Sequence, residues 1–168
     1  MDQEARVIRS FPPAIGANAK ILILGMMPSE PSLRVGQYYA NPQNAFWMIM
    51  GELFGAGPAL PYNERLLVLS RAGIALWDSL QRCTRNGSLD SSIRNAVAND
   101  FRTFFRAHPT ITHVFFNGKD PEAAFRRYAL RTLVNDPPVL KGLPSTSSAH
   151  ATLRPAAKLA EWRALLLV

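Results

Sequence analysis

The connection from Gly25 to Trp47 concentrates uncharged amides and aromatic rings between two apolar segments. These side chains are Gln37, Tyr38, Tyr39, Asn41, Asn44 and Phe46. Rings can stack on the face of a flat ligand while amides bond to the donors and acceptors along its edge, as happens when a nucleobase leaves the base stack. The segment therefore predicts a pocket for a flat, neutral, polar ligand.

A second polar segment, Leu143–His150, is rich in hydroxyl groups. Ser145, Thr146 and Ser147 follow a proline, and the hydroxyls and backbone N–H groups of such a turn can bind phosphate oxygens. The chain carries 19 basic and 12 acidic residues, a net charge of +7, which favours a polyanionic partner. The two segments together indicate binding of a base and of the phosphates that flank it.

The motifs of several common enzyme classes are absent from the sequence. No HExxH, CxxC or GxxxxGK[ST] motif occurs, which argues against a zincin or a P-loop enzyme, and no GxGxxG follows the first apolar run, which argues against a dinucleotide cofactor. Cys83 is the only cysteine, and a lone cysteine usually packs as a small apolar residue. A dyad of Ser147 and His150 is disfavoured because the nucleophile elbow is missing. Asp78 has two interpretations, a general base or a cap for the following turn, of which the cap is preferred.

Apolar runs and helical periodicities alternate along the chain. Strands are predicted at Ile21–Leu24, Ile74–Trp77, Thr110–Phe116 and Val139–Leu140. Helices are predicted from Phe46 to Gly55, after Asn63, from Asp90 through Phe105, at Ala123–Leu130 and from Pro155. This order predicts a single domain, residues 1–168, with a three-layer α/β/α sandwich around a central four-stranded parallel sheet.

The carboxyl ends of parallel strands are where ligands bind in such folds. The segments expected there are Gly25–Asn44, Trp77–Ser88, Asn117–Lys119 and Leu143–His150. Every unusual polar cluster of the sequence falls within them, which predicts one site built from four segments.

The sequence also bears on where the protein works. No run approaches the roughly 18 apolar residues that span a bilayer. The opening residues, MDQEARVIRS, lack a signal-peptide pattern. We therefore expect a cytoplasmic protein with no membrane partner. A monomer is also expected.

Four motifs resemble a known family. In chain order they are GMMPSEPSLRVGQYYANPQNAFW, GIALWDSLQRCTRNGSLDSSI, VFFNGKDPEAAF and LPSTSSAHA, all between Gly25 and Ala151. They are similar to the uracil-DNA glycosylase superfamily, and most similar to its deoxyinosine (hypoxanthine) DNA glycosylase branch. The resemblance implies an α/β/α fold and a monofunctional glycosylase of base excision repair. Such an enzyme flips a deaminated base out of DNA, hydrolyses its N-glycosidic bond and leaves an abasic site, without metal or cofactor.

The same resemblance assigns the catalytic water. Superfamily members commonly place Asp or Asn before the proline of the first motif, where this chain has Met26 and Met27. The role of positioning the water is therefore assigned to an asparagine later in the motif, with Asn44 as first choice and Asn41 as second. For Asn44 the alternative is a cap at the start of the next helix. The methionines also motivate a second hypothesis, a catalytically weak or inactive DNA-binding module of the same fold.

The remaining assignments by resemblance concern the base and the DNA backbone. The base-binding residues are Gln37, Tyr38, Tyr39, Phe46, Asn117 and Met27, with Asn117 at a position that reads the edge of the base. For Tyr38, Tyr39 and Phe46 the alternative to stacking on the base is a place in the core. The DNA-binding residues are Ser145, Thr146, Ser147, Ala149, His150 and Lys119. Ala149 and His150 fall where relatives insert a wedge, and His150 has two further interpretations, stabilising charge on the departing base or contacting a phosphate. Hypoxanthine is the first substrate expected and uracil the second, because an asparagine can bond to either base. An unrelated nucleotide-processing enzyme, acting on free nucleosides or nucleotides, is the third hypothesis.

Overall fold

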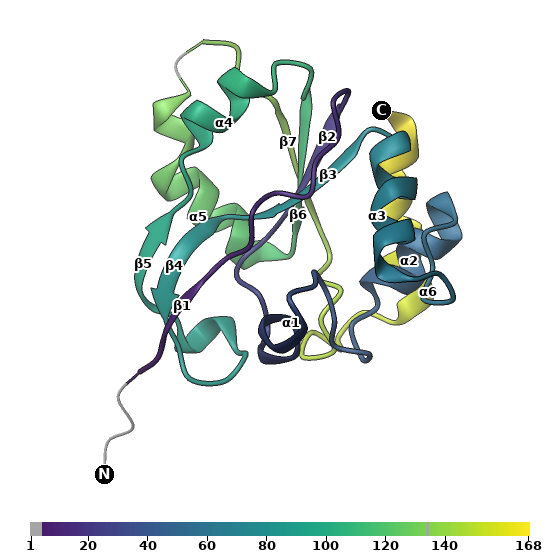
Figure 1. Ribbon diagram of the computed structural model, residues 1–168, viewed down its shortest axis with the longest axis horizontal. Coiled ribbons are helices and arrows are strands. Elements are labelled where there is room, and N and C mark those ends of the chain that lie inside the picture. The colour runs from purple at the N-terminus through teal and green to yellow at the C-terminus, as the bar shows by residue number, and fades with distance from the viewer. Residues whose placement is uncertain (1–4, 134) are drawn as a thin grey trace.

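A parallel sheet of four strands forms the centre of the protein (Figure 1). The computed structural model describes residues 5–133 and 135–168. The strands run in the order β3-β2-β6-β7, and each neighbouring pair is parallel. Their bounds are Ile21–Gly25 for β2, Ile74–Asp78 for β3, His113–Asn117 for β6 and Val139–Leu143 for β7. The predicted four-stranded parallel sheet is confirmed, with a last strand longer than the sequence indicated.

Helices cover both faces of this sheet (Figure 1). They are α2 (Phe46–Phe54), α3 (Tyr62–Arg71), α4 (Phe101–Ala107), α5 (Lys119–Tyr128) and α6 (Pro155–Trp162). Side chains alternate along β2, so Ile21 and Ile23 join a core with α2, α3 and α6, whereas Leu22 and Leu24 join a core with α4 and α5. A strand buried on both sides explains the uninterrupted apolar run in the sequence. The predicted three-layer α/β/α arrangement is confirmed.

A second, antiparallel sheet was not predicted. It contains β1 (Val7–Arg9), β4 (Leu80–Thr84) and β5 (Arg94–Ala98), in the order β1-β4-β5. Cys83 lies in β4 and is buried, in agreement with the packing role expected for it.

The predicted helix from Asp90 through Phe105 is wrong in its first half. Asp90 begins a single 3-10 turn, η1 (Asp90–Ser92), and β5 follows. The helix α4 begins only at Phe101, where the Asp100 side chain accepts a hydrogen bond of 3.1 Å from the Thr103 N–H. Val97, which the helical spacing placed on the buried face, is 36% exposed, so that spacing did not mark an apolar helix face.

The connection after β2 contains a helix that was not predicted. It is α1 (Glu30–Val35), which Ser29 caps at its start and Gly36, with φ of 67°, ends in the left-handed region. Two further 3-10 turns are η2 (Leu130–Thr132) and η3 (Arg163–Leu167). Among the described residues, no helix has the length and apolar character needed to cross a membrane.

Candidate active site

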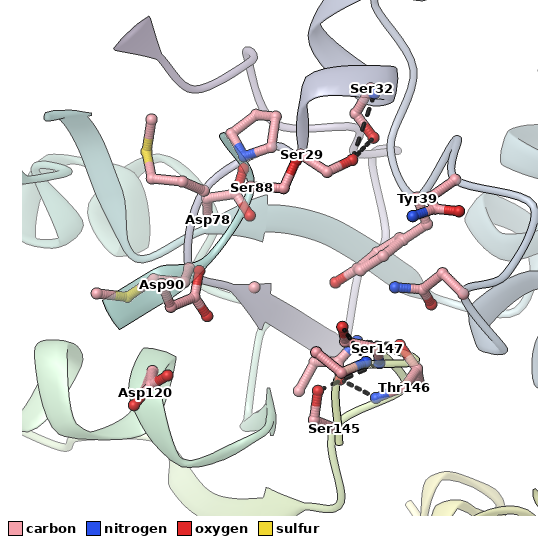
Figure 2. A pocket seen from close by; sticks show the side chains of 18 of the residues that line it. Ser29, Ser32, Tyr39, Asp78, Ser88, Asp90, Asp120, Ser145, Thr146 and Ser147 are labelled. Atoms are coloured by element: carbon pink, nitrogen blue, oxygen red, sulfur yellow. Dashed lines mark hydrogen bonds between the residues drawn. The ribbon is translucent and has the colours of Figure 1, made fainter. Parts of the chain in front are cut away.

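A cavity of about 340 Å³ opens at the carboxyl edge of the parallel sheet. Gly25, Asp78 and Asn117, the last residues of β2, β3 and β6, all line it. Figure 2 shows Asp78, Asp90 and Asp120 on one side of the cavity and Tyr39 on the other, with the segment from Ser145 to Ser147 at one end. The site therefore lies at the predicted edge of the sheet and draws on each of the four segments named above.

The two asparagines predicted to hold water both line the cavity and both cap backbone turns. Asn44 Oδ1 accepts a 2.9 Å hydrogen bond from the Phe46 N–H, and Asn41 Oδ1 accepts a 3.0 Å bond from the Gln43 N–H. An N–H donor must face an amide oxygen, so these bonds fix which way each carboxamide points. Each oxygen keeps a second lone pair and each Nδ2 keeps its protons, so capping and a role toward water are compatible in one residue.

Tyr39 lines the cavity, as Asn41 and Asn44 do. Its backbone has φ of 55°, an uncommon conformation for a tyrosine. Phe46 stacks on Tyr39 with ring centroids 3.9 Å apart, but it is fully buried in the core and does not line the cavity. Of the two interpretations of Phe46, stacking on the base and a place in the core, the structure agrees with the core, where Phe46 supports Tyr39 from behind. Gln37 also lies outside the cavity lining.

Tyr38 reaches the cavity but is mostly committed to the surrounding structure. Its hydroxyl donates to the Pro12 carbonyl at 2.9 Å, and its own carbonyl accepts a bond from the Trp47 indole N–H at 2.9 Å. Burial raises the pKa of this phenol, with a further contribution from the Asp78 charge. Tyr38 therefore holds the loop in place, and Tyr39 presents the freer polar group.

Asn117 is engaged with the serine-rich turn. Its Nδ2 donates to Thr146 Oγ1 at 2.9 Å, and its Oδ1 accepts from the Thr146 N–H at 2.8 Å. Asn117 lines the cavity, so its edge-reading role stays a prediction, but both ends of its amide already position the turn. Thr146 was expected to contact the DNA backbone, but it is 1% exposed. Its hydroxyl accepts the bond from Asn117 and so ties the turn to β6.

The other predicted DNA-binding residues are distributed around the mouth of the cavity. Ser145, Ser147, Ala149 and His150 line it, and the last two are exposed. Ser147 Oγ accepts a 3.3 Å hydrogen bond from the Ala149 N–H, which folds this loop back on itself. Lys119, the exposed first residue of α5, lies outside the lining. Contacts of these residues with DNA stay predictions.

Asp78 lies in the site, although the cap of a turn was the preferred interpretation of this residue. It ends β3 directly opposite Gly25, and its side chain leans so far over that glycine that a Cβ there would lie 2.7 Å from Asp78 Oδ1. Asp78 is buried, its Oδ2 has no hydrogen-bond partner among the described residues, and the same is true of the Tyr39 hydroxyl. That Cβ would also lie 3.1 Å from the Tyr39 hydroxyl, so the two groups sit close together over Gly25.

Burial controls the charge of Asp78. Desolvation, with a smaller contribution from the Asp90 charge, raises its pKa to about 7, and the Arg85 guanidinium opposes this shift. The carboxyl therefore spends much of its time protonated near neutral pH, with one O–H donor and one acceptor. The preferred interpretation of Asp78 as the cap of a turn is not supported, because its carboxyl faces the cavity and makes no hydrogen bond to a turn N–H of the described residues.

The loop with Asp90 adds a second carboxyl group to this side of the cavity. Arg85 fixes the loop by donating to the carbonyls of Gly87 and Pro28. Desolvation and the neighbouring Asp120 raise the pKa of Asp90 to about 6, whereas Arg85 and His150 lower it. Asp90 is therefore mostly ionised above neutral pH. The sequence did not indicate that Asp90 lies in the site, because a helix was predicted to begin at this residue.

Met26 and Met27 fill the place where an activating side chain was expected. Met27 is 8% exposed, packs in the core beneath the antiparallel sheet and still reaches the cavity wall. A thioether is only a weak hydrogen-bond acceptor, so it does not activate water. Polar chemistry in the cavity therefore falls to the amides, the Tyr39 hydroxyl and the carboxyl groups.

Comparison with known families identifies the class to which this fold and site belong. The family model of the uracil DNA glycosylase superfamily matches residues 12–166. The chain therefore belongs to the uracil DNA glycosylase superfamily, and the predicted DNA glycosylase fold and enzyme class are confirmed.

Two curated proteins and one solved structure are similar to the chain over most of its length. The chain is 38% identical over 112 residues to a hypoxanthine DNA glycosylase of Methanosarcina barkeri, covering 66% of this chain and 71% of the relative. It is 36% identical over 146 residues to a hypoxanthine DNA glycosylase of Methanosarcina acetivorans, covering 84% and 87%. The solution structure of a putative uracil DNA glycosylase from Methanosarcina acetivorans matches with a TM-score of 0.77 and 33% identity, over 96% of this chain and 99% of that one.

Proposed function

We propose that this protein is a hypoxanthine DNA glycosylase of base excision repair. It takes deoxyinosine flipped out of DNA, hydrolyses the N-glycosidic bond and releases free hypoxanthine, leaving an abasic site. The observation that carries this proposal is the cavity at the carboxyl edge of the sheet, which brings neutral donors and acceptors together in a member of this superfamily. A volume of about 340 Å³ is within the range of small-molecule sites.

Asn44 positions the attacking water in this proposal. Its Oδ1 is held by the Phe46 N–H and uses its remaining lone pair to accept a hydrogen bond from the water. The bond from C1′ to the base breaks as positive charge develops on the sugar, so a weak water-positioning group suffices when the surroundings stabilise that charge. The ionised Asp90 carboxylate on the cavity wall is suited to this task, together with the DNA phosphates themselves.

Asp78 and Tyr39 recognise the base in this proposal. The lactam edge of hypoxanthine presents an N–H donor next to a carbonyl acceptor. A protonated carboxyl at Asp78 matches it with its own acceptor and donor, and the neighbouring Tyr39 hydroxyl supplies one more polar contact. Because ligand-free Asp78 and Tyr39 leave buried polar atoms unpaired, base binding relieves an unfavourable state of the protein.

The preference for hypoxanthine over uracil rests on the two named relatives. Uracil has a lactam edge of its own, so the carboxyl group of Asp78 bonds to either base. Duplexes and single strands that contain one inosine or one uracil, cleaved with alkali at abasic sites, measure the preference directly. We expect kcat/KM for inosine to exceed that for uracil by at least about tenfold. Faster cleavage at uracil would make the protein a uracil glycosylase and overturn the substrate assignment.

The proposal includes the setting of the enzyme. Its partner is DNA that contains a deaminated base, and we place the protein in the cytoplasm as a monomer. The alternative of a DNA-binding module without catalysis rests on Met26 and Met27. The polar groups gathered around the cavity favour the enzyme, since a module that only binds DNA does not require unpaired buried donors and acceptors beneath the base.

A further inference from the structure

A buried lysine lies beneath the serine-rich turn. Lys158, in α6, is 5% exposed, and its ammonium donates a 3.3 Å hydrogen bond to the Ser147 carbonyl. The single ion pair within residues 5–133 and 135–168 joins Arg126 to Glu122, so no carboxylate of the described chain lies within 4.0 Å of Lys158. Burial lowers the pKa of this ammonium, and no neighbouring carboxylate offsets the effect.

The turn above this lysine is fastened through its carbonyl groups. The Pro144 carbonyl accepts from the Trp162 indole N–H at 2.9 Å, and the Thr146 carbonyl accepts from the Ala45 N–H at 3.0 Å. The Ser147 carbonyl is bonded to Lys158, so three backbone carbonyls of the turn face the protein. The Ser145 and Ser147 side chains line the cavity instead, so the turn presents hydroxyl groups to a ligand.

A buried cation is unfavourable unless an opposite charge and hydrogen bonds compensate it. A DNA phosphate bound to the Ser145 and Ser147 hydroxyls would lie on the opposite side of the turn from the Lys158 ammonium. The Lys158 ammonium touches the turn through the Ser147 carbonyl, and Lys158 itself has little contact with solvent, so screening of its charge is weak. The phosphate is the anion that the described chain does not supply.

We propose that Lys158 is a positioning residue for DNA binding. It holds the Ser147 carbonyl, and its ammonium provides the counter-charge for the phosphate bound at the turn. This inference rests on the proposed function for its ligand, DNA, but it requires no base release. It assigns a role in DNA binding to α6, which also covers the sheet and holds the Pro144 carbonyl through Trp162.

Binding of a duplex with a tetrahydrofuran abasic-site analogue, measured over a series of salt concentrations, tests this role. We expect Lys158→Met, which keeps the apolar stem, to weaken binding by about tenfold and to reduce the slope of log K against log salt by about 1. Lys158→Arg should restore most of the slope. In steady-state cleavage of inosine DNA, Lys158→Met should raise KM more than it lowers kcat.

Lys141→Met is the matched control. It removes the same charge from an exposed lysine of β7, outside the cavity lining, and should leave the slope nearly unchanged. The proposal is overturned if Lys158→Met binds with wild-type affinity and slope, or if Lys158→Arg is no better than Lys158→Met. If Lys158→Met does not fold, Lys158→Gln replaces it and the same comparison with Lys158→Arg applies. Tight DNA binding that depends on Lys158, without hypoxanthine release by the wild type, would refute the proposed function and leave this inference standing.

Discussion

Asn44→Ala is expected to lower the rate of base release from inosine DNA by about 10²–10³-fold, the range for losing a positioned catalytic group. The substitution removes the oxygen that orients the water. It also removes the bond from the Phe46 N–H, which should cost only about 1 kcal/mol of stability. A folded protein with near-normal affinity for abasic DNA but very slow chemistry is the expected result. Single-turnover kinetics with excess enzyme measure that chemistry separately from product release.

Two variants separate catalysis from capping. Asn44→Asp keeps an oxygen for the Phe46 N–H and for water, so it should be far more active than Asn44→Ala. Asn41→Ala is the matched control, since Asn41 also lines the cavity and caps a backbone N–H. It should lose less than about tenfold. Near-normal turnover in Asn44→Ala together with loss in Asn41→Ala would move the catalytic role to Asn41.

Asp78→Asn is expected to change how stability depends on pH. The folded-state pKa of Asp78, about 7, lies above the ordinary value of 3.8. Between about pH 4 and 7 the folded protein holds a proton that the unfolded chain has released, so this group makes stability fall as pH rises. Above pH 7 the whole penalty is present. The variant should therefore gain on the order of 3 kcal/mol relative to wild type between pH 5 and pH 8, or about 5–10 °C in Tm.

The opposite sign is expected at Asp100. Its pKa is lowered by hydrogen bonds from Thr103, so its carboxylate adds stability that is lost as pH falls. Asp100→Asn is therefore the control for Asp78→Asn in thermal unfolding across this pH range. A parallel pH dependence of wild type and Asp78→Asn would show that Asp78 is ionised in the folded protein and would contradict its role as a hydrogen-bond donor.

The excision activity of two Asp78 variants shows whether base recognition requires the charge of this side chain or only its hydrogen-bonding groups. Asn keeps a donor and an acceptor at residue 78, so Asp78→Asn should retain hypoxanthine excision within about tenfold. Asp78→Leu is close in shape but bonds to nothing, and kcat/KM should fall by about 10–100-fold. Equal activity of Asp78→Leu and wild type would remove Asp78 from base recognition.

The fold was predictable where burial imposes a simple pattern. Ile21–Leu24 is apolar throughout because cores lie on both sides of β2, and this run alone indicates a central parallel strand. The segment after Asp90 was predicted wrongly, as a helix where the chain forms β5. Its strand pairs at a sheet edge, with irregular register against β4 and a positive φ at Asn95, so neither alternation nor helical spacing describes it.

The site was predictable in its location and only partly in its chemistry. The amides and serines stood out because such residues are unusual after apolar strands. Asp78 did not, because its importance follows from its register with Gly25, which places a carboxyl over a residue without a side chain. Likewise, Asn117 and Phe46 have suitable residue types, but their contacts with Thr146 and Tyr39 appear only in three dimensions.

Release of free base from a duplex with a single inosine tests the central claim most directly. Purified protein and DNA are incubated with EDTA, the supernatant is analysed by chromatography with mass detection, and the DNA is tested for an alkali-labile site. We expect free hypoxanthine in amounts equal to the abasic sites formed, with the DNA backbone intact before alkali. Tight binding of the inosine duplex with neither hypoxanthine nor abasic sites formed would contradict a glycosylase and leave a DNA-binding module of the same fold.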